Sequence, residues 1–301
     1  MPPPGIPSPL PIATHVFRQP LPYKRTLELQ EAIVQARSQA RKTDPMSELA
    51  RRDILLLLEH RPTFTTGRRD SLPSSLERIQ REEERLKHAG ADWAVTRRGG
   101  QVTFHGPGQV VGYCLFELGG MKLSTKCFVD KTQRLLADYV THTLDGKKVF
   151  APHPDDHVGV FPTLDSKISS MGIQIRQRLT SHGFSLNVLP DPLPWFDLIE
   201  ACGLPNFIRA TSLSEFTSKG LSSRTVRSVE QDLVDRFGRT FGPEEENSGV
   251  VDLMKSGEDG KGGVIGQLVR SLEKEVATDG FEWNSQPRKS EQIDGWPKDH
   301  T

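Results

Sequence analysis

Residues 97–118, RRGGQVTFHGPGQVVGYCLFEL, concentrate backbone freedom within one strand-turn-strand pattern. The stretch contains five glycines, at positions 99, 100, 106, 108 and 112. Glycine allows backbone angles and close approaches that side chains forbid. The pattern therefore predicts either a glycine-rich turn in a sheet or a loop whose backbone contacts an elongated ligand.

Three better-known glycine motifs do not match this stretch. A P-loop ends in Gly-Lys-Ser/Thr, and no glycine here is followed by that pair. A dinucleotide-binding GxGxxG opens a helix, whereas Gly106, Gly108 and Gly112 are spaced GxGxxxG and lead into an apolar strand. HGPG is similar to the oxyanion loop of esterases, but the chain contains no GxSxG nucleophile motif, which disfavours a serine hydrolase.

The rest of the chain mixes helical and strand patterns. Apolar stripes predict helices over 26–42, 74–89, 124–144 and 226–237, the first two separated by a wholly apolar strand at 54–58. Ser74 and Glu77 have capping-box spacing, and alternation over 167–188 predicts a hairpin. Because strands and helices do not alternate regularly, the sequence predicts an α+β domain.

Composition divides the chain into three parts. Residues 1–14 form a proline-rich leader, and no acidic residue precedes Glu28. Residues 15–242 carry the predicted elements of one globular domain, which a chain of 301 residues is long enough to form. Residues 243–301 are polar and rich in helix breakers, so we expect a largely disordered extension with one helix over 264–276.

Charge and cysteine content exclude several classes of function. Lys plus Arg total 39, as do Asp plus Glu, so no overall field favours nucleic acid or an anionic membrane. The longest purely apolar run, 54–58, is far too short to span a membrane. Three widely spaced cysteines argue against a disulfide framework or a structural zinc site and favour a reducing compartment.

One cluster of metal-ligand residue types occurs in HPDDH. It contains His153, Asp155, Asp156 and His157, but Pro154 prevents a helical pair of histidines. We therefore expect no metal, and nothing in the sequence indicates a cofactor.

Five segments together resemble the lipoyl(octanoyl) transferase family. They are EHRPTFTTGRR, RRGGQVTFHGPGQVVGY, HPDDHVGVF, SKISSMGIQIRQRLTSHGFSLNV and ACGLPNFIRATSL, in family order from about residue 60 to 213. The resemblance implies an α+β fold like that of biotin and lipoate protein ligases, similar to class II synthetases, with a mixed sheet flanked by helices. It also implies an enzyme that transfers octanoyl from acyl carrier protein to a lysine of lipoyl domains.

The same resemblance implies roles for individual residues. Cys202 matches the family's nucleophile and Lys167 its lysine, which would stabilise the thiolate and carry a proton. Taken alone, Cys202 would be a small buried hydrophobe and Lys167 an exposed strand-end residue. The acyl and donor site would be lined by Arg98, Gly99, Gly100, Gln101, Val102, Thr103, Phe104, His105, Ser170, Met171, Gly172, Gly183, Phe184 and Ser185.

Several features remain open from sequence. His105 and His182 could act as bases, although a structural role is favoured because Cys202 and Lys167 already account for the protons. Met171 stands where the family commonly has leucine, and Glu200 and Ala201 precede the cysteine where proline is usual.

The resemblance also implies partners and a compartment. The donor would be octanoyl-acyl carrier protein, and the acceptors would be lipoyl domains of glycine cleavage H protein and of 2-oxoacid dehydrogenase E2 subunits. The family works in bacterial cytoplasm and in mitochondria, and the acid-free leader favours a mitochondrion over the cytoplasm. Two rival functions are an ATP-dependent lipoate or biotin ligase, which needs no cysteine, and a non-catalytic protein that binds lipoyl domains.

Overall fold

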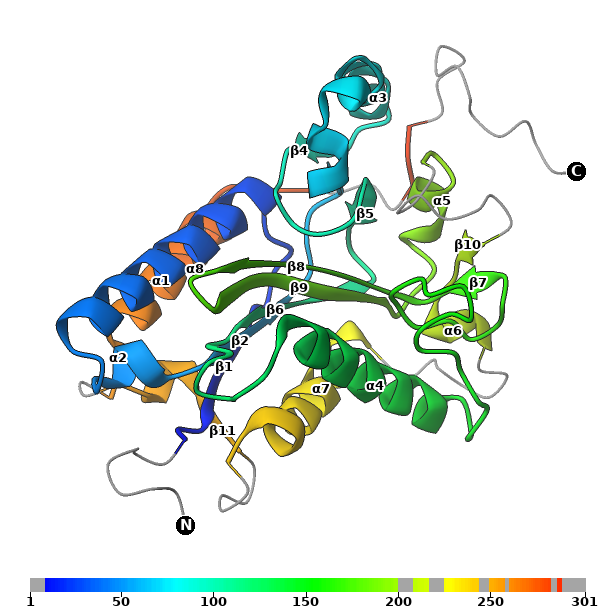
Figure 1. Cartoon of the computed structure of the whole chain (residues 1–301). Coiled ribbons are helices and arrows are strands. Elements are labelled where there is room, and N and C mark those ends of the chain that lie inside the picture. Colours follow the sequence, from blue (N-terminus) through cyan, green and yellow to red (C-terminus); the bar gives the residue numbers. More distant parts are fainter. Residues whose placement is uncertain are drawn as a thin grey trace, which may run out of the picture.

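The computed structural model describes residues 9–199, 208–216, 225–243, 249–257, 260–282 and 286–288 (Figure 1). Its largest sheet has six strands in the order β11-β1-β2-β6-β9-β8. These strands are β1 (Ile12–Val16), β2 (Ile54–Leu58), β6 (Gln109–Leu115), β8 (Ser169–Arg176), β9 (Leu179–Asn187) and β11 (Val250–Asp252). The first three strands in that order run parallel and the remaining neighbours are antiparallel, which confirms the mixed sheet.

Helices cover both faces of this sheet (Figure 1). One face packs against α4 (Thr125–Thr143) and α7 (Val226–Phe241), and the other against α1 (Tyr23–Thr43) and α8 (Gly263–Ala277). Burial on both faces explains why β2 is wholly apolar. Leu55 and Leu57 enter the core beneath α4 and α7, while Leu56 and Leu58 enter the core beneath α1 and α8. The prediction of a strand buried on both faces is confirmed.

Smaller elements complete the fold. A three-stranded sheet in the order β4-β3-β5 packs with one helix and a short helical turn around a third apolar cluster. Its members are β3 (Thr63–Thr65), β4 (Asp92–Ala94), β5 (Thr103–His105), α3 (Leu76–His88) and α5 (Leu193–Phe196). A separate parallel pair joins β7 (Ser166–Lys167) to β10 (Arg209–Ala210), and α2 (Glu48–Arg51) and α6 (Leu213–Phe216) are single turns.

One local prediction is wrong. Helix α3 begins at Leu76 after a 3₁₀ turn over 73–75, and its N-cap residue is Ser75, without a side-chain capping bond. Ser74 therefore lies inside the preceding turn and cannot form the expected capping box with Glu77.

The chain after residue 242 contributes to the core. The helix expected over 264–276 is present as α8, and β11 adds an edge strand that pairs with β1. Ile265, Val269 and Leu272 of α8 belong to the same buried cluster as Ile33 of α1. The packed core therefore extends past residue 242, the domain boundary that composition indicated. Within the described ranges, no helix is long and apolar enough to cross a membrane.

Truncating α8 in the core tests this packing. Leu272→Ala removes a buried side chain, so we expect the free energy of unfolding to fall by about 2–5 kcal/mol. Lys274→Ala, on the exposed side of the same helix, should change it by less than about 0.5 kcal/mol. Urea titration of both variants measures the difference, and equal stabilities would contradict a core role for α8.

Candidate active site

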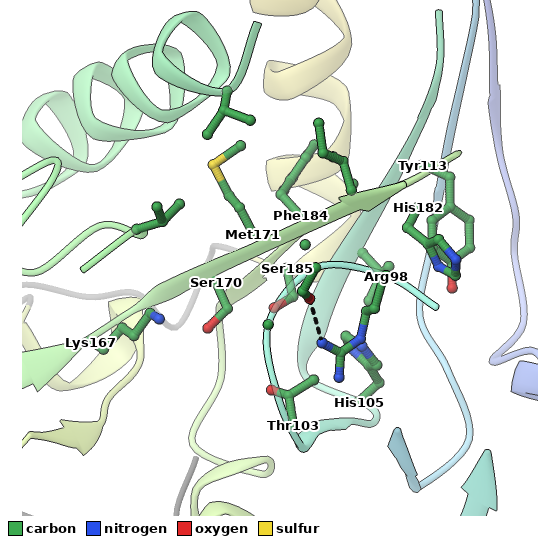
Figure 2. A pocket seen from close by; sticks show the side chains of 18 of the residues that line it. Arg98, Thr103, His105, Tyr113, Lys167, Ser170, Met171, His182, Phe184 and Ser185 are labelled. Carbon is green, nitrogen blue, oxygen red and sulfur yellow. Dashed lines mark hydrogen bonds between the residues drawn. The ribbon is translucent and has the colours of Figure 1, made fainter. Parts of the chain in front are cut away.

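A cavity of about 300 Å³ lies beside β8, the edge strand of the large sheet (Figure 2). The loop from Arg97 lies against this strand, where the Gly99 N–H donates a 3.0 Å hydrogen bond to the Ile173 carbonyl. A Cβ on Gly172 would lie 2.6 Å from the Gly99 carbonyl oxygen. The glycine at position 172 therefore allows loop and sheet to approach as closely as they do.

Only part of the segment predicted from Arg98 to His105 lines the cavity. Arg98, Gly99, Gly100, Thr103 and His105 line it. Side chains alternate across β5, so Phe104, between the last two, points the opposite way. It stacks on Trp195 with ring centroids 5.1 Å apart and belongs to the third apolar cluster.

The other two members of this predicted segment have no place on the cavity wall. Val102 is buried, and the Gln101 carbonyl accepts a 2.9 Å hydrogen bond from Arg98, so Gln101 helps to hold the guanidinium.

All six predicted hairpin residues line the cavity. Register pairs Ser170 with Ser185 and Gly172 with Gly183. Met171 pairs with Phe184, and both line the cavity from the other face, which is reachable because β8 is the edge strand. The family resemblance assigned these six residues to the site, and the structure brings all of them to one cavity.

Lys167 lies buried at the cavity wall, with 7% of its surface exposed (Figure 2). Its Nζ is 5.4 Å from the centre of the Phe161 ring, a favourable arrangement for an ammonium. Ala210 pairs with Lys167 in the β7–β10 ladder, and the Thr211 N–H donates a 2.9 Å bond to the Lys167 carbonyl.

Cys202 lies outside the described residues, so its position relative to Lys167 stays a prediction. The next described strand, β10, begins seven residues later, at Arg209, and pairs directly with the strand that carries Lys167. The segment that starts at Arg209 is therefore tied to the strand that carries Lys167.

A chain of hydrogen-bonded, buried side chains connects the glycine loop to Thr211, beside Lys167. The His105 Nδ1–H donates to Gln109 Oε1 at 2.7 Å, and Gln109 Nε2 donates to Asn187 Oδ1 at 2.9 Å. Asn187 Nδ2 in turn donates to the Thr211 carbonyl at 2.9 Å. These bonds fix the orientation of the ring, while burial, with His60 and Arg98 nearby, holds the pKa of His105 well below its usual range. A neutral, oriented His105 is consistent with the structural role favoured from sequence.

The far end of the cavity is polar, and of its lining residues sequence reasoning had named only His182. Tyr23, Tyr113 and His182 line it, with His60 directly behind. The His60 Nδ1–H donates to the Leu21 carbonyl, and its Nε2 accepts from the Tyr113 hydroxyl. Tyr23 starts a helix and Tyr113 alternates within a strand, so neither carries a local signal of function.

Comparison with known proteins identifies the family. Residues 22–238 match the family model described as the lipoyl protein ligase A/B catalytic domain. The chain belongs to this family. It is 35% identical over 193 residues to the mitochondrial octanoyl-[acyl-carrier-protein]:protein N-octanoyltransferase of Danio rerio, covering 64% of this chain and 76% of the relative. It is 33% identical over 234 residues to an octanoyltransferase of Nitrobacter hamburgensis, covering 75% and 85%.

Solved structures confirm the fold. Protein Ta0514 of T. acidophilum, solved with bound lipoic acid, has a TM-score of 0.54 at 15% identity, covering 89% of this chain and 94% of that one. A bipartite lipoate protein ligase from Thermoplasma acidophilum has a TM-score of 0.50 at 16% identity, covering 94% and 100%. The chain is thus an acyltransferase built on the lipoate ligase fold.

The two described cysteines of this acyltransferase differ in environment. Cys114 is fully buried in β6, and burial raises the pKa of its thiol far above the ordinary value. A thiol of that kind is a poor nucleophile. Cys127 lies exposed in the first turn of α4.

The HPDDH cluster of the acyltransferase is held by its own hydrogen bonds. His153 Nε2 donates to the Leu164 carbonyl at 3.1 Å, and His153 Nδ1 accepts from the Asp155 N–H at 3.2 Å. Ligand atoms of His153, Asp155 and His157 lie within 4.8 Å of one another. Since both ring nitrogens of His153 already make hydrogen bonds, the cluster stabilises the conformation of this loop.

Burial of His182 in the acyltransferase makes stability depend on pH. Burial lowers the pKa of His182 to about 3, whereas the unfolded side chain titrates near 6.5. The unfolded state therefore binds the extra proton below pH 6.5, and His182 costs the fold about 2 kcal/mol at pH 5 relative to pH 7.5. His182→Asn, which tolerates the local φ of 58°, should reduce the loss of stability over that range by this amount.

Urea unfolding of wild type and variant at both pH values measures this difference. Comparing the two proteins removes the opposing contribution of Glu230, whose carboxyl pKa burial raises to about 8. Exposed His142→Asn serves as the control and should follow wild type. Identical pH dependence of the His182 variant and wild type would show that His182 titrates normally in the fold.

Proposed function

We propose that this chain transfers an octanoyl group from octanoyl-acyl carrier protein to a lysine of a lipoyl domain, through a thioester on Cys202. The observation that carries the proposal is the buried Lys167 at the wall of the cavity, whose backbone carbonyl accepts a hydrogen bond from Thr211, nine residues after Cys202. The names of the relatives support octanoyl transfer from a carrier protein to a protein.

The first step moves the acyl group onto the enzyme. The Cys202 thiolate attacks the carbonyl carbon of the donor thioester, forming a new C–S bond as the bond to the carrier sulfur breaks. The Lys167 ammonium stabilises the thiolate and then gives its proton to the departing carrier thiolate. Lys167 is left as a neutral amine.

The second step completes the transfer without ATP. The amine of the acceptor lysine attacks the Cys202 thioester, a C–N bond forms, and the C–S bond breaks. Neutral Lys167 takes the proton that the attacking amine loses, which restores the thiolate and ammonium together. Backbone N–H groups of the glycine loop are proposed to hold the developing oxyanion.

The cavity is proposed to hold the acyl chain. Its volume, about 300 Å³, is at the small end for ligand sites, and Val111, Val129 and Val158 add apolar surface to Met171 and Phe184. The predicted residues that line it, among them Arg98, Ser170 and Ser185, are proposed to bind the chain and the donor thioester.

Partners and compartment follow from the same proposal. The donor is octanoyl-acyl carrier protein, and the acceptors are lipoyl domains of glycine cleavage H protein and of 2-oxoacid dehydrogenase E2 subunits. A solved lipoylation system that resembles this fold includes an E2 lipoyl domain. The mitochondrial relative supports a mitochondrial site of action.

A transfer assay separates this function from its rivals. With octanoyl-acyl carrier protein and an apo lipoyl domain, we expect octanoylation of one lysine in the absence of ATP. An ATP-dependent ligase, a rival that the shared ligase fold makes relevant, would act on free octanoate plus ATP and tolerate replacement of Cys202. Binding of the lipoyl domain without any transfer would instead support a non-catalytic protein.

A further inference from the structure

We propose that Gln133 on α4, acting through the peptide of Gly159, is a positioning residue for the Lys167 ammonium. Gln133 has no role in the chemistry described above, and its side chain is only 2% exposed. Its Oε1 accepts a 2.9 Å hydrogen bond from the Gly159 N–H, which joins the helix to the loop that precedes β7. The inference rests on the proposed role of Lys167.

Gly159 lies directly against the Lys167 side chain. A Cβ at this position would be 2.5 Å from Lys167 Cε and 3.3 Å from Nζ, and also 2.5 Å from the Ser169 carbonyl oxygen. The backbone φ of 146° likewise favours glycine. The bare Gly159 backbone therefore forms one wall of the slot through which the lysine stem reaches the cavity.

The next residues fix the other end of this wall. The Val160 N–H donates to the Ser169 carbonyl at 3.1 Å, and the Ile168 N–H donates back to the Val160 carbonyl at 2.9 Å. Phe161, the following residue, presents its ring to Lys167 Nζ. The slot thus has one side anchored to the sheet by β-type bonds and the other anchored to α4 by Gln133.

The part of helix α4 that carries Gln133 faces the cavity. Val129, one helical turn before Gln133, lines the cavity, and residues four apart share a helix face. Without the Gln133 oxygen, the buried Gly159 N–H loses its acceptor and the peptide must rotate or shift to find another. A lysine stem has four rotatable bonds, so a displaced wall lets the ammonium move away from the reacting atoms.

The test replaces Gln133 by leucine, which keeps volume and removes the acceptor. We expect kcat to fall about 10- to 100-fold with KM for the donor changed less than about 3-fold. Gln133→Glu keeps an accepting oxygen and should recover most of the activity. Thr143→Val, which removes a buried bond to the Tyr139 carbonyl on the same helix, should behave as wild type.

The pH dependence of Cys202 alkylation by iodoacetamide separates positioning from mere stability. The ionisable groups that line the cavity besides Lys167 are Tyr23, Arg69, Arg98, His105, Tyr113, Asp156, His157 and His182, and none of them is changed by these variants. We expect the pH midpoint of Cys202 alkylation in Gln133→Leu to rise toward that of Lys167→Met. Both are measured well below the melting temperature of each variant. Should Gln133→Leu fail to fold, Gly159→Ala, which pushes on Lys167 Cε, should give the same rise.

The outcomes are distinguishable. If Lys167→Met raises the midpoint but Gln133→Leu and Gly159→Ala leave midpoint and kcat at wild-type values, the positioning role is wrong and the proposed function stands. If Lys167→Met itself leaves the midpoint unchanged, the proposed pairing of Cys202 with Lys167 is wrong.

Discussion

Replacing Cys202 by serine is expected to lower kcat for octanoyl transfer by a factor on the order of 10⁴ or more. A hydroxyl remains largely protonated where a thiol beside an ammonium ionises, so the attacking group is lost while the size of the side chain is kept. The rate of lysine octanoylation on an apo lipoyl domain, measured with saturating octanoyl-acyl carrier protein, reports the change.

The matched control is Cys127→Ser. Cys127 is exposed at the start of α4, where its backbone N–H donates to Ser124 Oγ, so its replacement should leave kcat within about 2-fold. A Cys202→Ser variant that retained a tenth or more of the wild-type rate would rule out the cysteine as the acyl carrier. Equal losses in both variants would mean that oxidation or misfolding, rather than chemistry, limits activity.

Lys167→Met should lower kcat by about 10²- to 10⁴-fold, the range that a positioned proton donor and acceptor contributes. Methionine preserves the apolar stem that packs near Phe161 and Gly159, so stability should change little. The loss should appear in both half-reactions, because the same group protonates the carrier thiolate and deprotonates the acceptor amine. Rapid-quench measurement of enzyme acylation and of transfer to the lipoyl domain resolves the two steps.

Exposed Lys148→Met controls for the loss of one positive charge and should leave both steps unaffected. A Lys167→Met enzyme that acylates itself at the wild-type rate and fails only in transfer would contradict a role in forming the thiolate. An enzyme slowed in neither step would remove Lys167 from the mechanism.

Local sequence patterns were sufficient for most elements of the fold. The unbroken apolar run of β2 and the alternation of the β8–β9 hairpin follow directly from which faces are buried. The edge of the sheet could not be predicted in this way, because β11 pairs with β1 across more than 200 residues. A three-residue strand that finds its partner at such a distance carries no local periodicity to read.

The candidate site, too, was only partly predictable from sequence. Phe104 was assigned to the cavity as part of a contiguous motif, but the pleat of β5 turns it toward Trp195 while Thr103 and His105 face the cavity. Tyr23 and Tyr113 converge on the cavity only through tertiary packing, so single-sequence reasoning had no means of grouping them. The role of Cys202 still rests on the family resemblance.

The most direct test of the account is to trap the acyl-enzyme. Wild-type protein is incubated with octanoyl-acyl carrier protein in the absence of a lipoyl domain, and the product is analysed by intact mass and peptide mapping. The account predicts one added octanoyl group, located on Cys202 and discharged when an apo lipoyl domain is added. An unmodified enzyme that still transfers octanoyl, or an adduct on another residue that discharges at the catalytic rate, would contradict it.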